Sequence, residues 1–171
     1  MEELVFWVED TACSGIKKIT DKVAGDVELV TGVRPRVLCG VAQEEFLSMA
    51  EEVETEIVTA TIGKSRMLEE MERKELICLE EIRGKRECYG WFFQKNPKKD
   101  GSQILLIAGS DKRGTIYGLF HLSELLGVSP LVDWCGIKPP HRDRAGLCPS
   151  MACVTKEPSV RYRGFFINDE W

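Results

Sequence analysis

The chain has 171 residues, of which 43% are hydrophobic and 30% are charged, a composition typical of a globular protein with one domain, or one domain and part of another. Its formal net charge of −5 argues against non-specific binding to nucleic acid, which depends on neutralising phosphates. Apolar runs fall well short of the roughly 20 residues of a membrane span. The sequence therefore predicts neither a nucleic-acid partner nor a membrane partner.

Seven cysteines are scattered along the chain without a framework of short spacings. An odd number of this kind fits a reducing compartment better than an oxidising one. The N-terminal MEELVFWVED has a short apolar run between acidic residues, whereas an export signal has a basic start and a longer apolar run. No export signal is therefore visible and cysteine usage favours the cytoplasm, but the localisation stays open.

The chain begins with a predicted strand and helix. Residues 4–8, LVFWV, form an apolar run typical of a buried strand. Apolar residues then recur at spacings of three and four between Ile16 and Val30, which predicts one helix with an apolar face. We expect Ser14 to be its N-cap and Gly32 to end it.

The next elements alternate in the same way. Residues 35–38 predict a second strand, and the acidic stretch 42–56 predicts a linker or a short exposed helix. Residues 56–62, EIVTATI, predict a third strand, and a charged helix is expected over about 65–76.

Two further strands and a helix complete this pattern. Residues 87–95 and 103–109 predict a strand pair joined by the turn NPKKDGS, whose lysines we expect in a short surface loop. A helix is predicted over about 114–126, ended by Gly127. This order predicts the α/β class, with helices packed on a mixed sheet.

The C-terminal part has a different composition. Residues 138–160 are rich in proline and short polar residues without periodicity, which predicts a linker or an exposed loop. Residues 160–167, VRYRGFFI, then predict a strand without partners to bury it. We expect this strand to be the beginning of another domain, and an exposed edge of this kind can pair with a second copy of the chain.

The stretch 107–120, IAGSDKRGTIYGLF, could be a phosphate-binding turn. It has two glycines at the spacing of a Walker motif, followed by a hydroxyl, but it lacks the lysine. The GKS at 63–65 has the lysine, but Val58 stands where the first glycine belongs. Asp111 would also repel a phosphate, so a capped strand-to-helix turn is the better explanation.

Packing accounts for most of the same stretch. Gly114 and Gly118 lie one helical turn apart and would let the helix lie close to a sheet. Asp111 suits the N-terminus of a helix electrostatically. Packing does not require the cations Lys112 and Arg113 beside that acid.

Metal and triad chemistry are weakly indicated. The spacing of the candidate ligands matches no familiar zinc pattern, so solvated loop cysteines are the better explanation. Two histidines and the absence of a G-x-S-x-G motif leave little for a serine triad, and His121 is expected to be structural. The candidate metal ligands are Cys135, His141, Cys148 and Cys153.

The C-terminal RGFFINDEW combines an apolar strand with Asn168, Asp169 and Glu170. A barrel strand delivers polar groups to the mouth of the barrel in this way, and paired carboxyls there suit glycoside hydrolysis. A charged tail explains the same residues equally well on spacing alone.

Four segments together resemble one family. In chain order they are ITDKVAGDVELVTGVRPRV, TIGKSRMLEEM, IAGSDKRGTIYGLFHLSELLGVSP and PSVRYRGFFINDE. From about residue 4 to 171 the chain resembles the N-terminal region of glycoside hydrolase family 115. Those enzymes are α-glucuronidases that remove glucuronic acid or its 4-O-methyl ether from xylan side chains.

The resemblance implies a domain division. Residues 1–158 would be an N-terminal α/β domain, and residues 159–171 would be the first strand of a (β/α)₈ barrel that is otherwise missing. The reaction implied is hydrolysis with inversion by acid and base carboxyls, without a cofactor or a metal. The main catalytic carboxyls are expected beyond residue 171, so this chain alone should be inactive. The alternative is a stand-alone carbohydrate-binding or protein-interaction module.

The resemblance also implies substrate contacts. Asn168, Asp169 and Glu170 would lie at the mouth of the first barrel strand and touch the sugar or its water. Lys112 and Arg113 would point toward the same pocket and meet the uronate carboxylate, which the fork of donors of an arginine suits. The implied partner, in a full-length relative, is a xylan-derived oligosaccharide that carries glucuronate.

Overall fold

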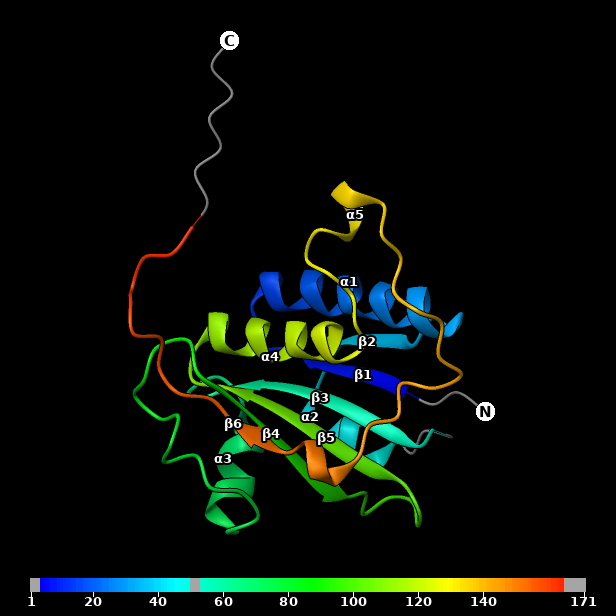
Figure 1. Ribbon diagram of the computed structural model, residues 1–171. Helices are drawn as coiled ribbons and strands as arrows, with labels where there is room; N and C mark the ends of the chain where they lie inside the picture. The colour runs from blue at the N-terminus through cyan, green and yellow to red at the C-terminus, as the bar shows by residue number, and fades with distance from the viewer. Residues whose placement is uncertain (1–3, 50–52, 165–171) are drawn as a thin grey trace.

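One mixed sheet organises the molecule (Figure 1). In residues 4–49 and 53–164, which the computed structural model describes, six strands pair in the order β2-β1-β3-β5-β4-β6. Four of them are parallel to one another, and β4 is antiparallel to both of its neighbours, β5 and β6. The strands are β1 (Leu4–Glu9), β2 (Arg36–Val41), β3 (Thr55–Thr61), β4 (Tyr89–Lys95), β5 (Gln103–Gly109) and β6 (Cys153–Val154).

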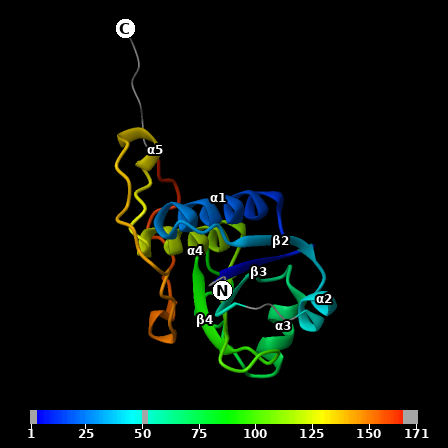
Figure 2. The ribbon, with the colours of Figure 1, turned by 90° about the vertical axis from the view of Figure 1, so that its right-hand side faces the viewer.

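Helices cover both faces of the sheet (Figure 2). The two long helices α1 and α4 lie side by side on one face, and the short helices α2 and α3 lie on the other. The helices are α1 (Ser14–Thr31), α2 (Gln43–Ser48), α3 (Arg66–Arg73), α4 (Lys112–Leu125) and α5 (Val132–Cys135), with a 3₁₀ turn at Pro149–Met151. This arrangement confirms the predicted α/β class and mixed sheet.

The alternation of side chains along β1 explains its continuous apolar run. Phe6 and Val8 pack under α1 and α4, whereas Val5 and Trp7 pack toward α2 and α3. All four side chains are at most 2% exposed. A strand covered on both faces needs apolar residues at every position, so LVFWV does not alternate with polar residues.

The boundaries of α1 differ from the prediction at one end. Gly32 ends the helix in the left-handed region, with φ 77°, and its N–H donates to the carbonyl of Glu28 at 2.8 Å, as predicted. Ser14 is the first helical residue and not the N-cap. Cys13 holds the cap position, because its backbone is extended and accepts the first helical hydrogen bonds.

The C-terminal part departs further from the prediction. Residues 138–160 were expected to lack regular structure, but β6 extends the sheet at the edge of β4 and Ala145 is 6% exposed. Residues 160–164, the described part of the strand expected at 160–167, pair with no other strand, so the barrel strand stays a prediction. Residues 165–167 lie outside the described residues. Self-association through this strand therefore has no support in the part that is described.

A membrane-spanning helix is not found among the described ranges, where no helix is both long enough and apolar enough.

Candidate functional site

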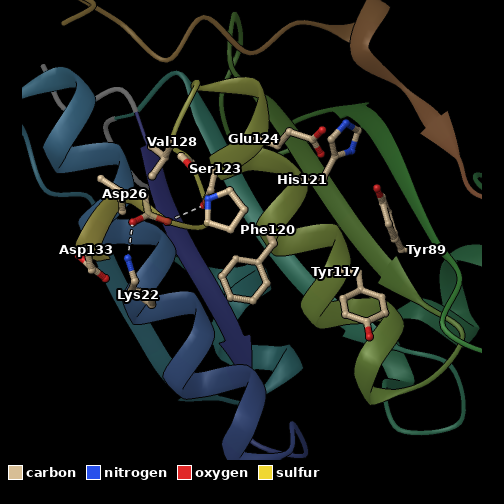
Figure 3. Close-up of a pocket in the computed structure, with 13 residues that line it drawn as sticks. Lys22, Asp26, Tyr89, Tyr117, Phe120, His121, Ser123, Glu124, Val128 and Asp133 are labelled. Carbon is tan, nitrogen blue, oxygen red and sulfur yellow. Dashed lines mark hydrogen bonds and ion pairs between the residues drawn. The ribbon is translucent and has the colours of Figure 1, made fainter. Parts of the chain in front are cut away.

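A cavity of about 670 Å³ lies on the solvent-facing side of α4 (Figure 3). It extends from Lys22 and Asp26 on α1 to Tyr89 on β4, and Phe120 and His121 of α4 line its floor. The segment 128–133 closes it on the side of α5. The cavity is one of two candidate sites. The other is the turn between β5 and α4, which the sequence singles out.

The turn between β5 and α4 is a fully bonded helix cap. The Oδ1 atom of Asp111 accepts from the N–H of Gly114 at 2.8 Å, and its Oδ2 atom accepts from the N–H of Glu87 at 3.0 Å. The aspartate therefore stabilises the N-terminus of α4 as predicted, and α4 begins at Lys112, two residues earlier than expected.

Glycines let this turn pack against its neighbours. A Cβ atom on Gly114 would lie 2.0 Å from the carbonyl oxygen of Cys88, and one on Gly118 would lie 2.5 Å from Ile107. Neither position has room for a side chain. The prediction that these glycines bring the helix close to the sheet is confirmed.

The hydroxyl at the start of the helix is also engaged. Thr115 Oγ1 lies 2.7 Å from Thr61 Oγ1 and donates to the carbonyl of Ala60 at 3.1 Å. These contacts tie α4 to the end of β3. Because the carboxylate of Asp111 already fills the helix N-terminus, the geometry favours a capped turn over a phosphate cradle.

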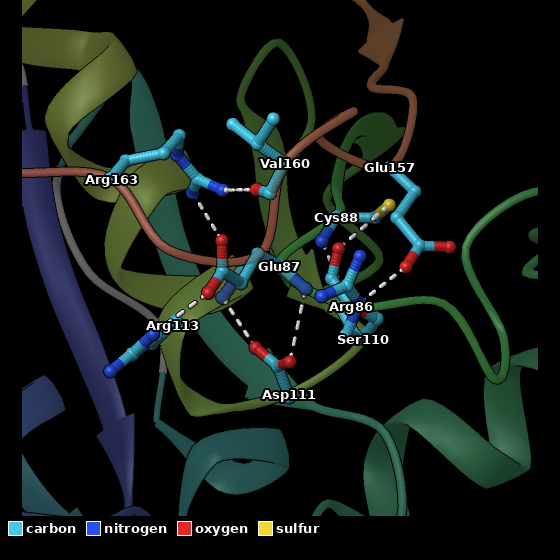
Figure 4. A network of polar contacts seen from close by, with 10 residues as sticks. Arg86, Glu87, Cys88, Ser110, Asp111, Arg113, Glu157, Val160 and Arg163 are labelled. Atoms are coloured by element: carbon cyan, nitrogen blue, oxygen red, sulfur yellow. Dashed lines mark hydrogen bonds and ion pairs between the residues drawn. The ribbon is translucent and has the colours of Figure 1, made fainter.

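A polar network surrounds this cap (Figure 4). Glu87 Oε1 accepts from Arg113 Nη1 at 2.8 Å, and Glu87 Oε2 accepts from Arg163. Hydrogen bonds from Arg163 and then Arg113 lower the pKa of Glu87 below its ordinary value. The backbone of Glu87 has φ 58°, a left-handed conformation that is rare for residues other than glycine and common at functional sites.

The same network fastens the chain after β6. The N–H of Thr155 donates to the carbonyl of Tyr89 at 2.9 Å, and its hydroxyl accepts from the N–H of Tyr89 at 2.8 Å. Arg86 Nε donates to Glu157 at 2.6 Å. With the contact between Arg163 and Glu87, these bonds hold residues 155–163 against β4 and α4.

Sequence reasoning found only part of this network. Arg113 lies within it, and Lys112 is the exposed first residue of α4. Glu87 and Arg163 were missed, because they are 76 residues apart and meet only after folding. The one local signal is the run of charges before β4. Asn168, Asp169 and Glu170 lie outside the described residues, so their approach to Arg113 stays a prediction.

The four candidate metal ligands are spread apart. His141 Nε2 lies 3.8 Å from Asp143, whereas Cys153 lies next to His121, with 3.8 Å between Sγ and Nδ1. Within the described part of the chain, no three His, Cys, Asp or Glu side chains converge on a common point. All seven cysteines are free thiols.

His121 packs against the aromatic residues of β4. Its ring centroid is 4.8 Å from that of Trp91 and 5.7 Å from that of Tyr89. Burial lowers the pKa of His121 below its ordinary value, so the ring is neutral near pH 7. The imidazole therefore has one donor and one acceptor nitrogen.

Comparison with known proteins gives an informative match among solved structures. No family model matches the sequence, and no curated protein matches it. Among solved structures, the chain is similar to a family GH115 4-O-methyl-α-glucuronidase that has specificity for decorated arabinogalactans. The TM-score is 0.66 at 27% identity, and the match covers 99% of this chain and 20% of that chain.

The chain thus spans 20% of the length of the solved enzyme that it matches. That segment has a fold similar to the α/β arrangement described above, and the structural alignment extends over almost every residue of the present chain. The match therefore confirms the resemblance to glycoside hydrolase family 115 that the sequence motifs indicate.

Proposed function

We propose that this chain is the N-terminal portion of a glycoside hydrolase that releases glucuronic acid or 4-O-methylglucuronic acid from polysaccharide side chains. The observation that carries this proposal is the match of 99% of the chain to 20% of a glucuronidase. The other parts of that enzyme have no counterpart in these 171 residues. The chain alone should therefore lack glycosidase activity, with the main acid and base carboxyls on later barrel strands.

The domain division is part of the same proposal. Residues 1–158 would form the N-terminal α/β domain, and residues 159–171 would open the barrel. In support, β6 is the edge strand of the described sheet, and the ion pairs of Glu157 and Arg163 fasten the chain that follows it. A following domain would then start from a fixed position near the N-terminus of α4.

We further propose that Lys112 and Arg113 meet the uronate carboxylate, together with Asn168, Asp169 and Glu170. Arg113 contacts Glu87 through Nη1, and its side chain is 65% exposed. A guanidinium has five N–H donors, so donors remain for a second carboxylate. Arg163 adds a second guanidinium to the same location.

The substrate is proposed as a glucuronate-bearing polysaccharide. Xylan is implied by the family resemblance, and decorated arabinogalactans are the specificity of the matched enzyme. Both classes carry neutral backbone sugars and acidic branches, so both belong in the assay.

Two turnover assays test the proposal. The purified chain is incubated with aldouronic acids and with glucuronate-bearing arabinogalactan fragments, and release of the uronate is measured. We expect none from the chain alone. We expect release when the chain replaces the matching region of the solved glucuronidase in a chimera. Activity of the chain alone, or a folded chimera without activity, contradicts the proposal.

A further inference from the structure

Exposed aromatic rings line the cavity on α4. Tyr117 is 36% exposed and Phe120 is 38% exposed, although apolar rings are normally covered when they gather on one helix face. Tyr89 and His121 extend the same aromatic wall toward β4 (Figure 3). A ligand pocket typically has this composition, with aromatic walls and a few polar groups.

One end of the cavity is held rigid by a buried carboxylate. Asp26 is 4% exposed; its Oδ1 atom accepts from Lys22 Nζ at 2.7 Å, and its Oδ2 atom accepts from Ser123 Oγ at 2.7 Å. Both oxygens are therefore used, and they join α1 to α4. Asp26 therefore shapes this end of the cavity. Only the ammonium of Lys22, which has further N–H donors, can hydrogen-bond a ligand here.

The other end has polar groups without a protein partner. The phenol of Tyr89, Nε2 of His121 and the carboxylate of Glu124 hydrogen-bond to no other side chain or backbone group in residues 4–49 and 53–164. Burial raises the pKa of Tyr89 to about 12, so its phenol stays a donor at neutral pH. These three groups can donate to and accept from hydroxyls that lie over the aromatic wall.

Charge selects among the possible ligands. The lining contains the carboxylates of Asp26, Glu124 and Asp133 and the single ammonium of Lys22, a formal balance of −2. A negative lining repels a uronate. It suits a neutral ligand rich in hydroxyls, because a carboxylate is a strong acceptor for O–H donors.

We infer that this cavity binds a neutral pyranose segment of a polysaccharide, stacked on Phe120 and Tyr117 and hydrogen-bonded to Glu124, His121 and Tyr89. The inference rests on the proposed function, which makes a polysaccharide the ligand class. The cavity volume of about 670 Å³ falls within the range of about 300–1,000 Å³ that is usual for ligand pockets.

The position of the cavity fits a branched substrate. Tyr117 lines the cavity, and its phenol lies near enough to Arg163 to help raise the pKa of that guanidinium, so the cavity adjoins the arginine pair on Glu87. Arg113 lies four residues before Tyr117, about 6 Å along α4. A neutral backbone on the aromatic wall would therefore place an acidic branch near two guanidiniums.

Titration of the isolated chain tests the inference. The probes are a linear xylo-oligosaccharide, a linear galacto-oligosaccharide and choline. Each is followed by calorimetry and by amide NMR shifts up to about 10 mM, a range that detects a Kd of about 1 mM. We expect binding of at least one neutral oligosaccharide, with the largest shifts at Tyr117, Phe120 and Glu124.

Variants locate the site. Phe120→Ala should weaken binding about tenfold or more and Glu124→Gln by several-fold, because they remove a stacking face and a charged acceptor. Leu125→Ala is the control, since Leu125 is also 36% exposed on α4 but does not line the cavity. Phe120→Tyr keeps the ring and should keep the affinity.

Other outcomes overturn the inference. They are no binding of either neutral oligosaccharide, binding that Phe120→Ala leaves unchanged, or a clear preference for choline, which would indicate a site for organic cations. The chimera assay is independent of this site. An active chimera with no oligosaccharide binding to the isolated chain removes the cavity proposal alone, whereas an inactive chimera removes the proposed function.

Discussion

Glu56 and Lys98 form an ion pair inside the protein. Lys98 Nζ lies 2.6 Å from Glu56 Oε2, and the two side chains are 7% and 0% exposed. Asn96 donates to the other oxygen of Glu56 at 2.7 Å, and the ammonium lies 3.9 Å from the ring centroid of Phe46. The pair thereby holds the β4–β5 turn against α2. The turn is a surface loop as expected, but the side chain of Lys98 is buried beneath it.

Removing one partner of this pair should be strongly destabilising. Lys98→Met leaves the carboxylate of Glu56 buried without its counter-ion, and we expect the free energy of unfolding to fall by about 3–5 kcal/mol. Arg83→Ala is the matched control, because Arg83 pairs with Glu72 at the surface and exposed pairs contribute about 1 kcal/mol or less. Urea denaturation measures both variants. Equal losses would mean that the buried pair has no special role.

Gly114 should tolerate no side chain. In Gly114→Ala the new Cβ would meet the Cys88 carbonyl, a backbone atom that cannot rotate away, so we expect a loss of about 1–3 kcal/mol. Gly25→Ala is the control in α1, where the nearest atom is the mobile end of Arg34 at 3.1 Å. Alanine favours helices over glycine by about 1 kcal/mol, so Gly25→Ala should be neutral or stabilising. A stable Gly114→Ala protein would contradict the tight packing of the turn.

The interaction of Glu87 with its arginines should make stability depend on pH. The folded-state pKa of Glu87 lies below the ordinary value of 4.5, so its contribution is fully present above pH 4.5 and is lost as the pH falls through the folded-state pKa. The difference in unfolding free energy between the wild type and Glu87→Gln should therefore be largest near neutral pH and shrink in acid. Glu80→Gln, at an exposed position, should show no such trend; a pH-independent difference at Glu87 would count against the network.

Arg113 should contribute to substrate affinity in the chimera. If Arg113 hydrogen-bonds the uronate, Arg113→Ala removes a charge-assisted hydrogen bond of about 1.5–3 kcal/mol and raises KM at least about tenfold for acidic substrates. Arg34→Ala is the control, because Arg34 pairs with Asp21 and Glu28 at the edge of α1. An unchanged KM for Arg113→Ala would remove Arg113 from the substrate site.

Much of the fold could be predicted from neighbouring residues. The apolar stripe from Ile16 to Val30 and the stop at Gly32 determine α1, because a helix depends on contacts three and four residues apart. The apolar runs 4–8 and 103–109 likewise predict buried strands, and Asp111 with Gly114 predicts the cap of α4. These features are local, so the chain shows them before it folds.

The buried ion pair and the candidate site depend on contacts that no local pattern reveals. Glu56 meets Lys98 across 42 residues, and Glu87 meets Arg163 across 76. Cys153 joins the sheet at Trp91 from a stretch that has the composition of a loop. The sequence by itself determined the long helices α1 and α4, the apolar strands of the sheet and the family resemblance. The tertiary structure alone decided which charges are paired, which rings line the cavity and where β6 joins, because these contacts form between segments that only the packed sheet brings together.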